Sequence, residues 1–245
     1  MTTYNFEAIM RPLGDSAIVV QLSTNIHPTV HQKIIQLTEI IEKDPFTGFI
    51  EVVPSYNSVT IYYNPIKIYQ TYTKKFITVY EKVSGFIENY LKQLGDTPNV
   101  EKRLIEVPVV YGGTYGPDLE EVARSNNLST DEVIAIHSKP EYLVYMIGFA
   151  PGFPYLGGMN ESIATPRKET PRPSIPSRSI GIAGKQTGIY TLETPGGWQI
   201  IGRTPLNLFS PKKNPPSLLK SGDKIRFVPI TSSEYEEIRR EQHDD

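Results

Sequence analysis

One residue type and several sequence patterns are missing from this 245-residue chain, and each absence excludes a class of protein or site. There is no cysteine, which excludes disulfides, thiolate zinc sites, iron–sulfur ligation and cysteine nucleophiles. The apolar runs are too short to span a bilayer, and residues 1–7 hold neither basic residues nor an apolar run. We therefore expect a cytoplasmic protein with no signal peptide and no membrane partner.

An excess of positive charge is also missing. The chain holds 25 Lys and Arg against 27 Asp and Glu, a net charge of −2, whereas nucleic-acid binders usually show a basic excess. Residues 118–126 and 129–137 resemble a helix-turn-helix. However, Asp131 and Glu132 begin the second helix, where contacts to DNA would fall. We expect no nucleic-acid partner.

Familiar catalytic and metal-binding motifs are absent too. The sequence contains no G-x-x-x-x-G-K-[ST] phosphate loop and no G-x-S-x-G nucleophile turn. His27 and His31 are four residues apart, but Pro28 lies between them and no carboxylate ligand is evident; the other two histidines are His137 and His243. Because a zinc site needs three or four ligands, we predict no protein-bound metal.

Glycine and proline are unevenly distributed, which indicates two domains of different architecture. Residues 1–102 hold 4 of the 18 glycines and 6 of the 21 prolines. We predict a small α+β domain over 1–94, a linker over 95–102, a mainly-β barrel domain over 103–230 and a charged tail over 231–245 that forms a short helix. The turn-rich stretch Gly95-Asp96-Thr97-Pro98-Asn99 supports this boundary.

The first domain is expected to be a small sheet with two helices. Apolar residues at helical spacing predict one helix after Pro28 and a second over 76–94. Runs rich in β-branched residues predict strands at 18–22, 50–53 and 59–63, with a hairpin-like connection over 54–58.

The second domain is expected to be mostly β-sheet with one helical insertion. Leu104 to Tyr111 reads as a strand, and Ser129 with Glu132 forms a capping box that begins a helix. Short β-like runs then alternate with Gly/Pro turns, as is typical of a barrel or sandwich; they cover 180–183, 189–192, 198–201 and 225–228.

Three clusters in this domain are candidates for chemistry. Residues 148–158 combine four glycines and two prolines with three aromatics, which suits either a pocket for a small planar ligand or a rigid barrel-closing loop. Residues 166–185 carry five basic residues against one acid, which suits either an anion site or a solvated basic loop. Residues 194–205 hold the single tryptophan and Arg203, which would either point into a pocket or bond loop carbonyls.

These clusters closely resemble the family of 5-oxoprolinase B subunits, which also contains sporulation-kinase inhibitors and the small subunit of allophanate-hydrolase-like, urea-amidolyase-type carboxyltransferase pairs. The resemblance covers nearly the whole chain. Its motifs include Leu13-Gly14-Asp15, Val52-Val53-Pro54-Ser55-Tyr56, Tyr111-Gly112-Gly113, Gly116-Pro117-Asp118-Leu119, Tyr145 to Phe153, Pro166-Arg167, Pro171-Arg172, Ile182-Ala183-Gly184, Gln186-Thr187-Gly188, Pro195 to Trp198 and Gly202-Arg203-Thr204-Pro205.

The resemblance implies a cyclophilin-like barrel and a component, inactive alone, of a hydrolase that opens 5-oxo-L-proline to L-glutamate. It implies A and C subunits of 5-oxoprolinase as partners, with ATP and Mg²⁺ serving the complex rather than a metal held by this chain. The alternatives are an inhibitor of a sensor histidine kinase that acts through the barrel, and a component of an allophanate- or urea-type amide hydrolase. The fold alone does not imply prolyl isomerase activity.

Site residues are assigned on the same basis. Arg203 or Arg172 is expected to bind the substrate carboxylate, and Gln186 with Thr187 to hydrogen-bond the lactam edge. His137 is expected either to transfer protons or to be a structural residue at a helix end. The predicted catalytic residues are His137 and Arg203, and the predicted substrate-binding residues are Phe149, Phe153, Arg172, Gln186, Thr187, Tyr190 and Thr204. We expect Phe149, Gln186 and Arg203 to line one hollow.

One departure from the family pattern stands at residues 176–179. The family pattern has Pro-Ala-Gly-Ser, and this chain has Pro176-Ser177-Arg178-Ser179. An arginine adopts a positive φ only at a cost, so the conformation of this loop is open.

Overall fold

The computed structural model describes residues 8–72, 78–95 and 103–241 and contains two compact units, residues 1–101 and 102–245. Each unit has its own hydrophobic core. The predicted linker lies almost wholly outside the described residues, as do Phe76 and His243.

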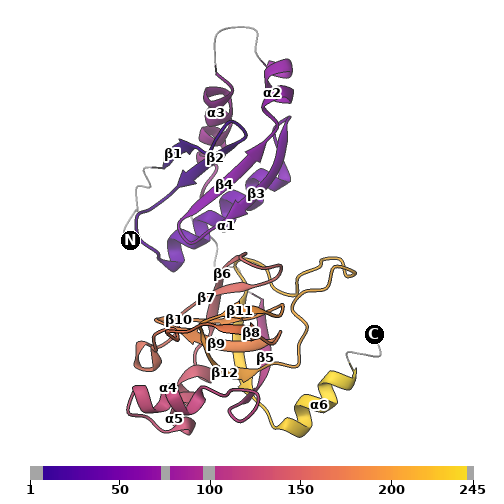
Figure 1. Ribbon diagram of the computed structural model, residues 1–245. Coiled ribbons are helices and arrows are strands. Elements are labelled where there is room, and N and C mark those ends of the chain that lie inside the picture. The colour runs from indigo at the N-terminus through magenta and orange to yellow at the C-terminus, as the bar shows by residue number, and fades with distance from the viewer. Residues whose placement is uncertain (1–7, 73–77, 96–102, 242–245) are drawn as a thin grey trace. The chain divides into compact units, whose positions relative to one another are not determined.

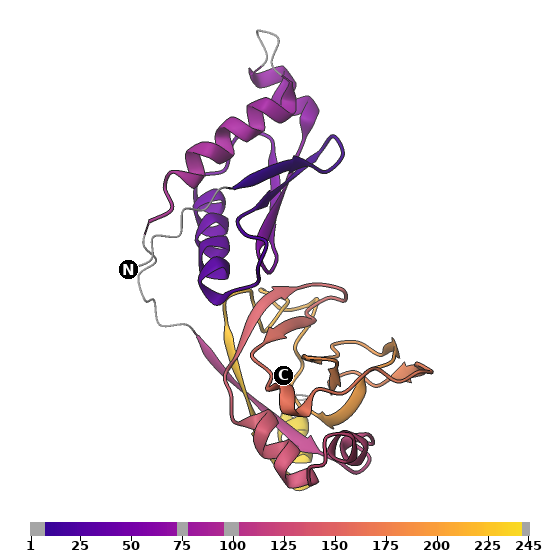
Figure 2. The ribbon, with the colours of Figure 1, turned by 90° about the vertical axis from the view of Figure 1, so that its left-hand side faces the viewer.

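The first unit is a four-stranded antiparallel sheet with helices on one face (Figures 1 and 2). The strand order is β1-β2-β4-β3. The elements are β1 (Ile9–Pro12), β2 (Ala17–Gln21), α1 (Pro28–Lys43), β3 (Phe49–Pro54), β4 (Ser58–Tyr63), α2 (Pro65–Tyr72) and α3 (Val79–Leu91). The two predicted helices and three predicted strands are present, whereas β1 and α2 were not predicted from the sequence.

Local sequence explains where the two long helices begin. Pro28 stands in the first turn of α1, where the missing N–H costs nothing, and the His27 side chain caps the N–H of Thr29. Thr78 and Glu81 form a reciprocal capping box at the start of α3. The apolar faces of both helices then bury side chains against the sheet. Each fully buried large side chain contributes about 1.5–3 kcal/mol to the free energy of unfolding.

The second unit is a seven-stranded mixed sheet that curves into a nearly closed barrel (Figure 1). The strand order is β10-β9-β12-β5-β13-β6-β7, and the two edge strands β7 and β10 pack against each other. Its strands are β5 (Leu104–Tyr111), β6 (Tyr142–Ile147), β7 (Pro154–Gly157), β9 (Ser179–Ala183), β10 (Gln186–Ile189), β12 (Gln199–Arg203) and β13 (Lys224–Pro229). The finer assignment, a cyclophilin-like barrel, stays a prediction.

Further elements surround this sheet. They are a two-stranded ribbon of β8 (Arg172–Ile175) and β11 (Thr194–Gly196), helices α4 (Leu119–Ser125), α5 (Thr130–Ser138) and α6 (Ser232–Glu241), and the 3₁₀ helix Glu161–Ile163. The Ser129–Glu132 capping box begins α5 as predicted. The strand expected at 189–192 is displaced to Gln186–Ile189, because Gly184 at φ 57° makes a tight turn directly after β9.

Neither a membrane helix nor a metal cluster is found in the described part of the chain. No helix there is long and apolar enough to cross a bilayer. The same residues contain no group of three or more His, Cys, Asp or Glu side chains that could hold a metal ion.

Candidate functional site

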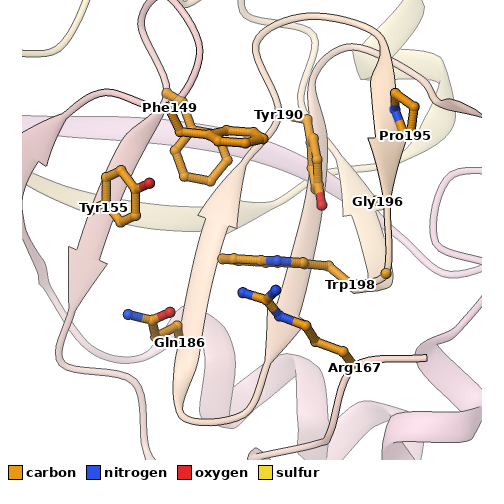
Figure 3. Close-up of a pocket in the computed structure, with 10 residues that line it drawn as sticks. Phe149, Tyr155, Arg167, Gln186, Tyr190, Pro195, Gly196 and Trp198 are labelled. Atoms are coloured by element: carbon orange, nitrogen blue, oxygen red, sulfur yellow. The ribbon is translucent and has the colours of Figure 1, made fainter. Parts of the chain in front are cut away.

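A hollow of about 200 Å³ lies on the barrel unit, between the loop before β7, the start of β10 and the turn before β12 (Figure 3). Its lining is mainly aromatic, with one cation and one amide. The lining residues are Phe149, Phe153, Tyr155, Arg167, Gln186, Tyr190, Pro195, Gly196, Gly197 and Trp198. Such a composition suits a small, flat, partly polar ligand.

The aromatic wall is built around Phe153. This ring is 3% exposed and makes edge-to-face contacts with Phe149, Tyr155, Tyr190 and Trp198, at centroid distances of 5.5, 5.2, 5.9 and 6.0 Å. Edge-to-face pairs fix the relative orientation of the rings. Gly188 makes the packing possible, because a Cβ there would lie 3.0 Å from Phe153 and 3.1 Å from Trp198. The wall is therefore preformed.

Phe149 projects from a strained turn at the mouth of the pocket. It has φ 66° and its side chain is 72% exposed. Backbone bonds from Ala150 to Gly148 and from Phe153 to Ala150 fold the turn tightly, and the Thr191 hydroxyl donates to the Pro151 carbonyl at 2.7 Å. A left-handed conformation in a non-glycine residue costs about 1–2 kcal/mol and is often found at functional sites. The glycine- and proline-rich loop is thus both rigid and part of a pocket.

Tyr190 gives the pocket a hydroxyl group that is protonated at neutral pH. Burial raises the pKa of Tyr190 to about 12, although the positive charge of Arg167 acts in the opposite direction. The phenol can therefore donate a hydrogen bond to a ligand oxygen.

Four of the predicted site residues are brought together in this hollow. They are Phe149, Phe153, Gln186 and Tyr190. The pocket lining does not include His137, Arg172, Thr187, Arg203 or Thr204. The expectation that Arg203 joins Phe149 and Gln186 in one hollow is therefore corrected: its Nε donates to the Ser177 carbonyl at 3.0 Å instead.

Arg172 is held by a carboxylate outside the pocket lining. Its guanidinium lies 2.6 Å from Asp118, which also accepts from Lys168 at 3.0 Å and from the backbone N–H of Ile200 at 2.7 Å. Burial of Asp118 raises the pKa of its carboxyl, but these hydrogen bonds outweigh burial and hold the pKa below its ordinary value. Asp118 is therefore ionised and neutralises part of the basic cluster.

His137 and Thr187 lie together in the interior of the barrel. His137 is 0% exposed, and its ring lies 4.4 Å from that of Phe227. The Tyr111 hydroxyl is 2.8 Å from Nδ1, Thr187 Oγ1 is 2.9 Å from Nε2, and Thr187 donates to the Gly181 carbonyl. One neutral tautomer satisfies this chain of bonds, with Nδ1 accepting and Nε2 donating. Burial lowers the pKa of His137 to about 3.

Arg178 resolves the question left by the departure from the family pattern. It adopts φ 69°, so the loop keeps a conformation that favours glycine. Its backbone N–H donates to the Tyr190 carbonyl, and its own carbonyl accepts from the N–H of Thr204. The loop is thus joined to the strand end that carries Tyr190.

The sequence did not single out several residues that line the pocket. Tyr155 and the turn Pro195 to Gly197 were within motifs but were not assigned to the site. Arg167 belonged to the basic cluster without being singled out, and Trp198 drew notice only as the single tryptophan. A long-range contact brings them together, since the N–H of Lys168 donates to the Gly197 carbonyl at 2.7 Å.

Comparison with known proteins identifies relatives along most of the chain. The family model described as carboxyltransferase domain, subdomain C and D, matches residues 8–219. A Bacillus subtilis protein, named as the B subunit of 5-oxoprolinase, is 48% identical over 231 residues, covering 94% of this chain and 96% of the relative. An Escherichia coli O157:H7 protein of the same name is 39% identical, covering 89% and 94%.

A solved structure supports the architecture. The K. lactis urea amidolyase matches with a TM-score of 0.75 at 19% identity, covering 98% of this chain and 16% of that one. At this identity the likeness concerns the fold alone.

Proposed function

Because the chain belongs to the carboxyltransferase domain family of subdomains C and D, we propose that it is the B subunit of an ATP-dependent 5-oxoprolinase. The observation that carries the proposal is the 48% identity to a protein of that name, over nearly the full length of both. The A and C subunits are the proposed partners, and the reaction opens 5-oxo-L-proline to L-glutamate.

The aromatic pocket is the proposed binding place for the cyclic substrate. 5-Oxo-L-proline is a small flat ring with a lactam edge and a carboxylate, and the hollow offers aromatic walls, the Gln186 amide, the Tyr190 hydroxyl and the Arg167 cation. In this proposal Gln186 and Tyr190 hydrogen-bond the lactam, and Phe149 and Phe153 pack against the ring.

Opening a lactam requires activation of its carbonyl. We propose that the carbonyl oxygen takes the γ-phosphoryl group of ATP and that one water then adds to the carbon. The C–N bond breaks to leave an acyl phosphate, and a second water hydrolyses it to release phosphate. The net reaction consumes ATP and two water molecules and yields L-glutamate, ADP and phosphate. This chain has no phosphate-loop motif, so ATP with Mg²⁺ is assigned to a partner protein of the complex.

His137 is assigned a structural role in this proposal, because its two ring nitrogens are used inside the barrel. Contacts of Arg172, Thr187, Arg203 and Thr204 with the substrate stay predictions, as do kinase inhibition and a urea-type substrate.

The test is reconstitution with a matched pair of variants. The chain is combined with the A and C subunits, and glutamate formation from 5-oxo-L-proline is measured with and without ATP. Gln186→Ala is compared with Lys185→Ala, because these neighbours are both exposed and only Gln186 lines the pocket. We expect kcat/KM to fall about 3–10-fold for Gln186→Ala, the cost of one hydrogen bond, and to stay unchanged for Lys185→Ala. Full activity in the absence of this chain would overturn the proposal.

A further inference from the structure

Within the part of the chain that the structure describes, the pocket contains one cation, Arg167, that forms no ion pair with the protein. Three basic residues lie within six positions of the sequence here: Arg167, Lys168 and Arg172. Lys168 and Arg172 both pair with the ionised Asp118, at 3.0 and 2.6 Å. A ligand carboxylate would have to compete with a buried carboxylate for either of them.

Arg167 differs from its two neighbours in what its guanidinium contacts. Its Cζ lies 6.0 Å from the centroid of the Trp198 ring, and in the described ranges it forms no hydrogen bond or ion pair. Figure 3 shows the guanidinium beside the Trp198 ring, on the side where the Gln186 amide lies. An aromatic face holds an arginine in place while leaving its N–H groups available.

The charge of Arg167 also reaches the interior of the hollow. It lowers the pKa of the Tyr190 hydroxyl, although burial raises that pKa and has the larger effect. Arg167 and Tyr190 line the same pocket on either side of Trp198 (Figure 3). A guanidinium at this position can form two parallel bonds to a carboxylate, a geometry that an ammonium group does not match.

We infer that Arg167 determines the specificity of the pocket by binding the carboxylate of a small ring ligand, so that the pocket selects the acid over the neutral amide of the same ring. This inference rests on the proposed function for the identity of the ring. It assigns to Arg167 the role that the sequence analysis expected of Arg172 or Arg203.

The single tryptophan makes the inference directly measurable. Trp198 lines the pocket, so tryptophan fluorescence of the isolated full-length chain, excited where tyrosine does not absorb, reports on the pocket wall. The probes are 5-oxo-L-proline and 5-oxo-L-prolinamide, which share the lactam and differ in the carboxylate. The variants are Arg167→Gln, Arg167→Lys and the control Lys185→Gln, whose native side chain forms an exposed ion pair with Glu161.

We expect the wild-type chain to bind the acid about tenfold more tightly than the amide, as one exposed charge-assisted contact allows. Arg167→Gln should remove this preference by lowering the affinity for the acid without changing the affinity for the amide. Arg167→Lys should keep part of the preference, and Lys185→Gln should change neither affinity. Added salt should weaken binding of the acid and not of the amide. Because Arg167 is exposed, unchanged thermal unfolding of Arg167→Gln will show that the fold is intact.

Two contrary results are distinguishable. A preference for the acid that survives in Arg167→Gln overturns the inference and leaves the proposed function standing. Failure of the wild-type chain to bind either compound overturns the proposed ligand and the inference together.

Discussion

The buried cluster around His137 and the aromatic pocket both place polar groups among aromatic rings, yet they satisfy those groups differently. His137 has a partner on each ring nitrogen, Tyr111 and Thr187, and no access to solvent. In the pocket, Arg167 rests on Trp198 without an ion pair within the described residues. Complete internal pairing favours stability, whereas a polar group that lacks an internal partner is available to a ligand.

The largest effect expected from this comparison is on stability at His137. His137→Ala would create a cavity beside Phe227 and leave the partly buried Tyr111 hydroxyl without its partner. We expect a loss of about 3–5 kcal/mol in the free energy of unfolding, measured by urea denaturation. Ligand affinity of the folded fraction should be unchanged. A stable His137→Ala variant that no longer binds ligand would mean that His137 serves binding rather than stability.

A second, smaller effect is a dependence of stability on pH. Burial lowers the pKa of His137 from 6.5 to about 3 in the folded chain. The unfolded chain therefore takes up this proton more readily. The contribution of His137 is complete above pH 6.5 and is lost as the pH falls toward 3, by about 1.4 kcal/mol per pH unit.

The measurement is the free energy of unfolding between pH 7 and pH 4 for the wild type and His137→Gln. The free energy of unfolding of the variant should fall less steeply with decreasing pH, by the equivalent of one proton, because glutamine does not titrate. Exposed carboxylates contribute equally to both proteins and do not affect the difference. Equal slopes would mean that His137 is accessible to solvent in the folded state.

The smallest effect on stability is expected at Phe149, in the pocket. Phe149→Asn removes an exposed ring and places a residue that tolerates φ 66° in the strained turn, whereas Phe149→Ala removes the ring and keeps the strain. We expect Phe149→Asn to be more stable than Phe149→Ala by about 0.5–1 kcal/mol, with ligand affinity reduced in both. Thermal unfolding and Trp198 fluorescence give the two quantities. A large loss of stability in both variants would show that Phe149 is a structural residue like His137.

Sequence predicted those parts of the fold that depend on local patterns. Apolar spacing located α1 and α3, and the pair Ser129 and Glu132 located the start of α5. The short strands β7, β8 and β11 carry little pattern of their own, since each has only three or four residues and is defined by its partner strand. Their pairing depends on tertiary contacts that local propensity does not encode.

The candidate site was predictable to a similar extent. The glycine, proline and aromatic composition of residues 148–158 left a pocket and a rigid loop open, and the family resemblance added Phe149 and Phe153, which both line the pocket. Sequence alone could not tell whether Arg167 or Arg172 is available to a ligand. The answer depends on the ion pair of Arg172 with Asp118, which lies about fifty residues away in sequence. A basic cluster shows that cations are present, but only the structure shows which of them are already paired.

The parallel pairing of β5 with β13 has a consequence for how the barrel unit is completed. These two strands are the first and last of the seven in sequence, and they lie side by side from Leu104 opposite Lys224 to Val109 opposite Pro229. More than a hundred residues separate the end of β5 from the start of β13, its parallel neighbour. Such distant pairing is slow to form, so we expect the pairing of β5 with β13 to be a late step in folding of the barrel unit.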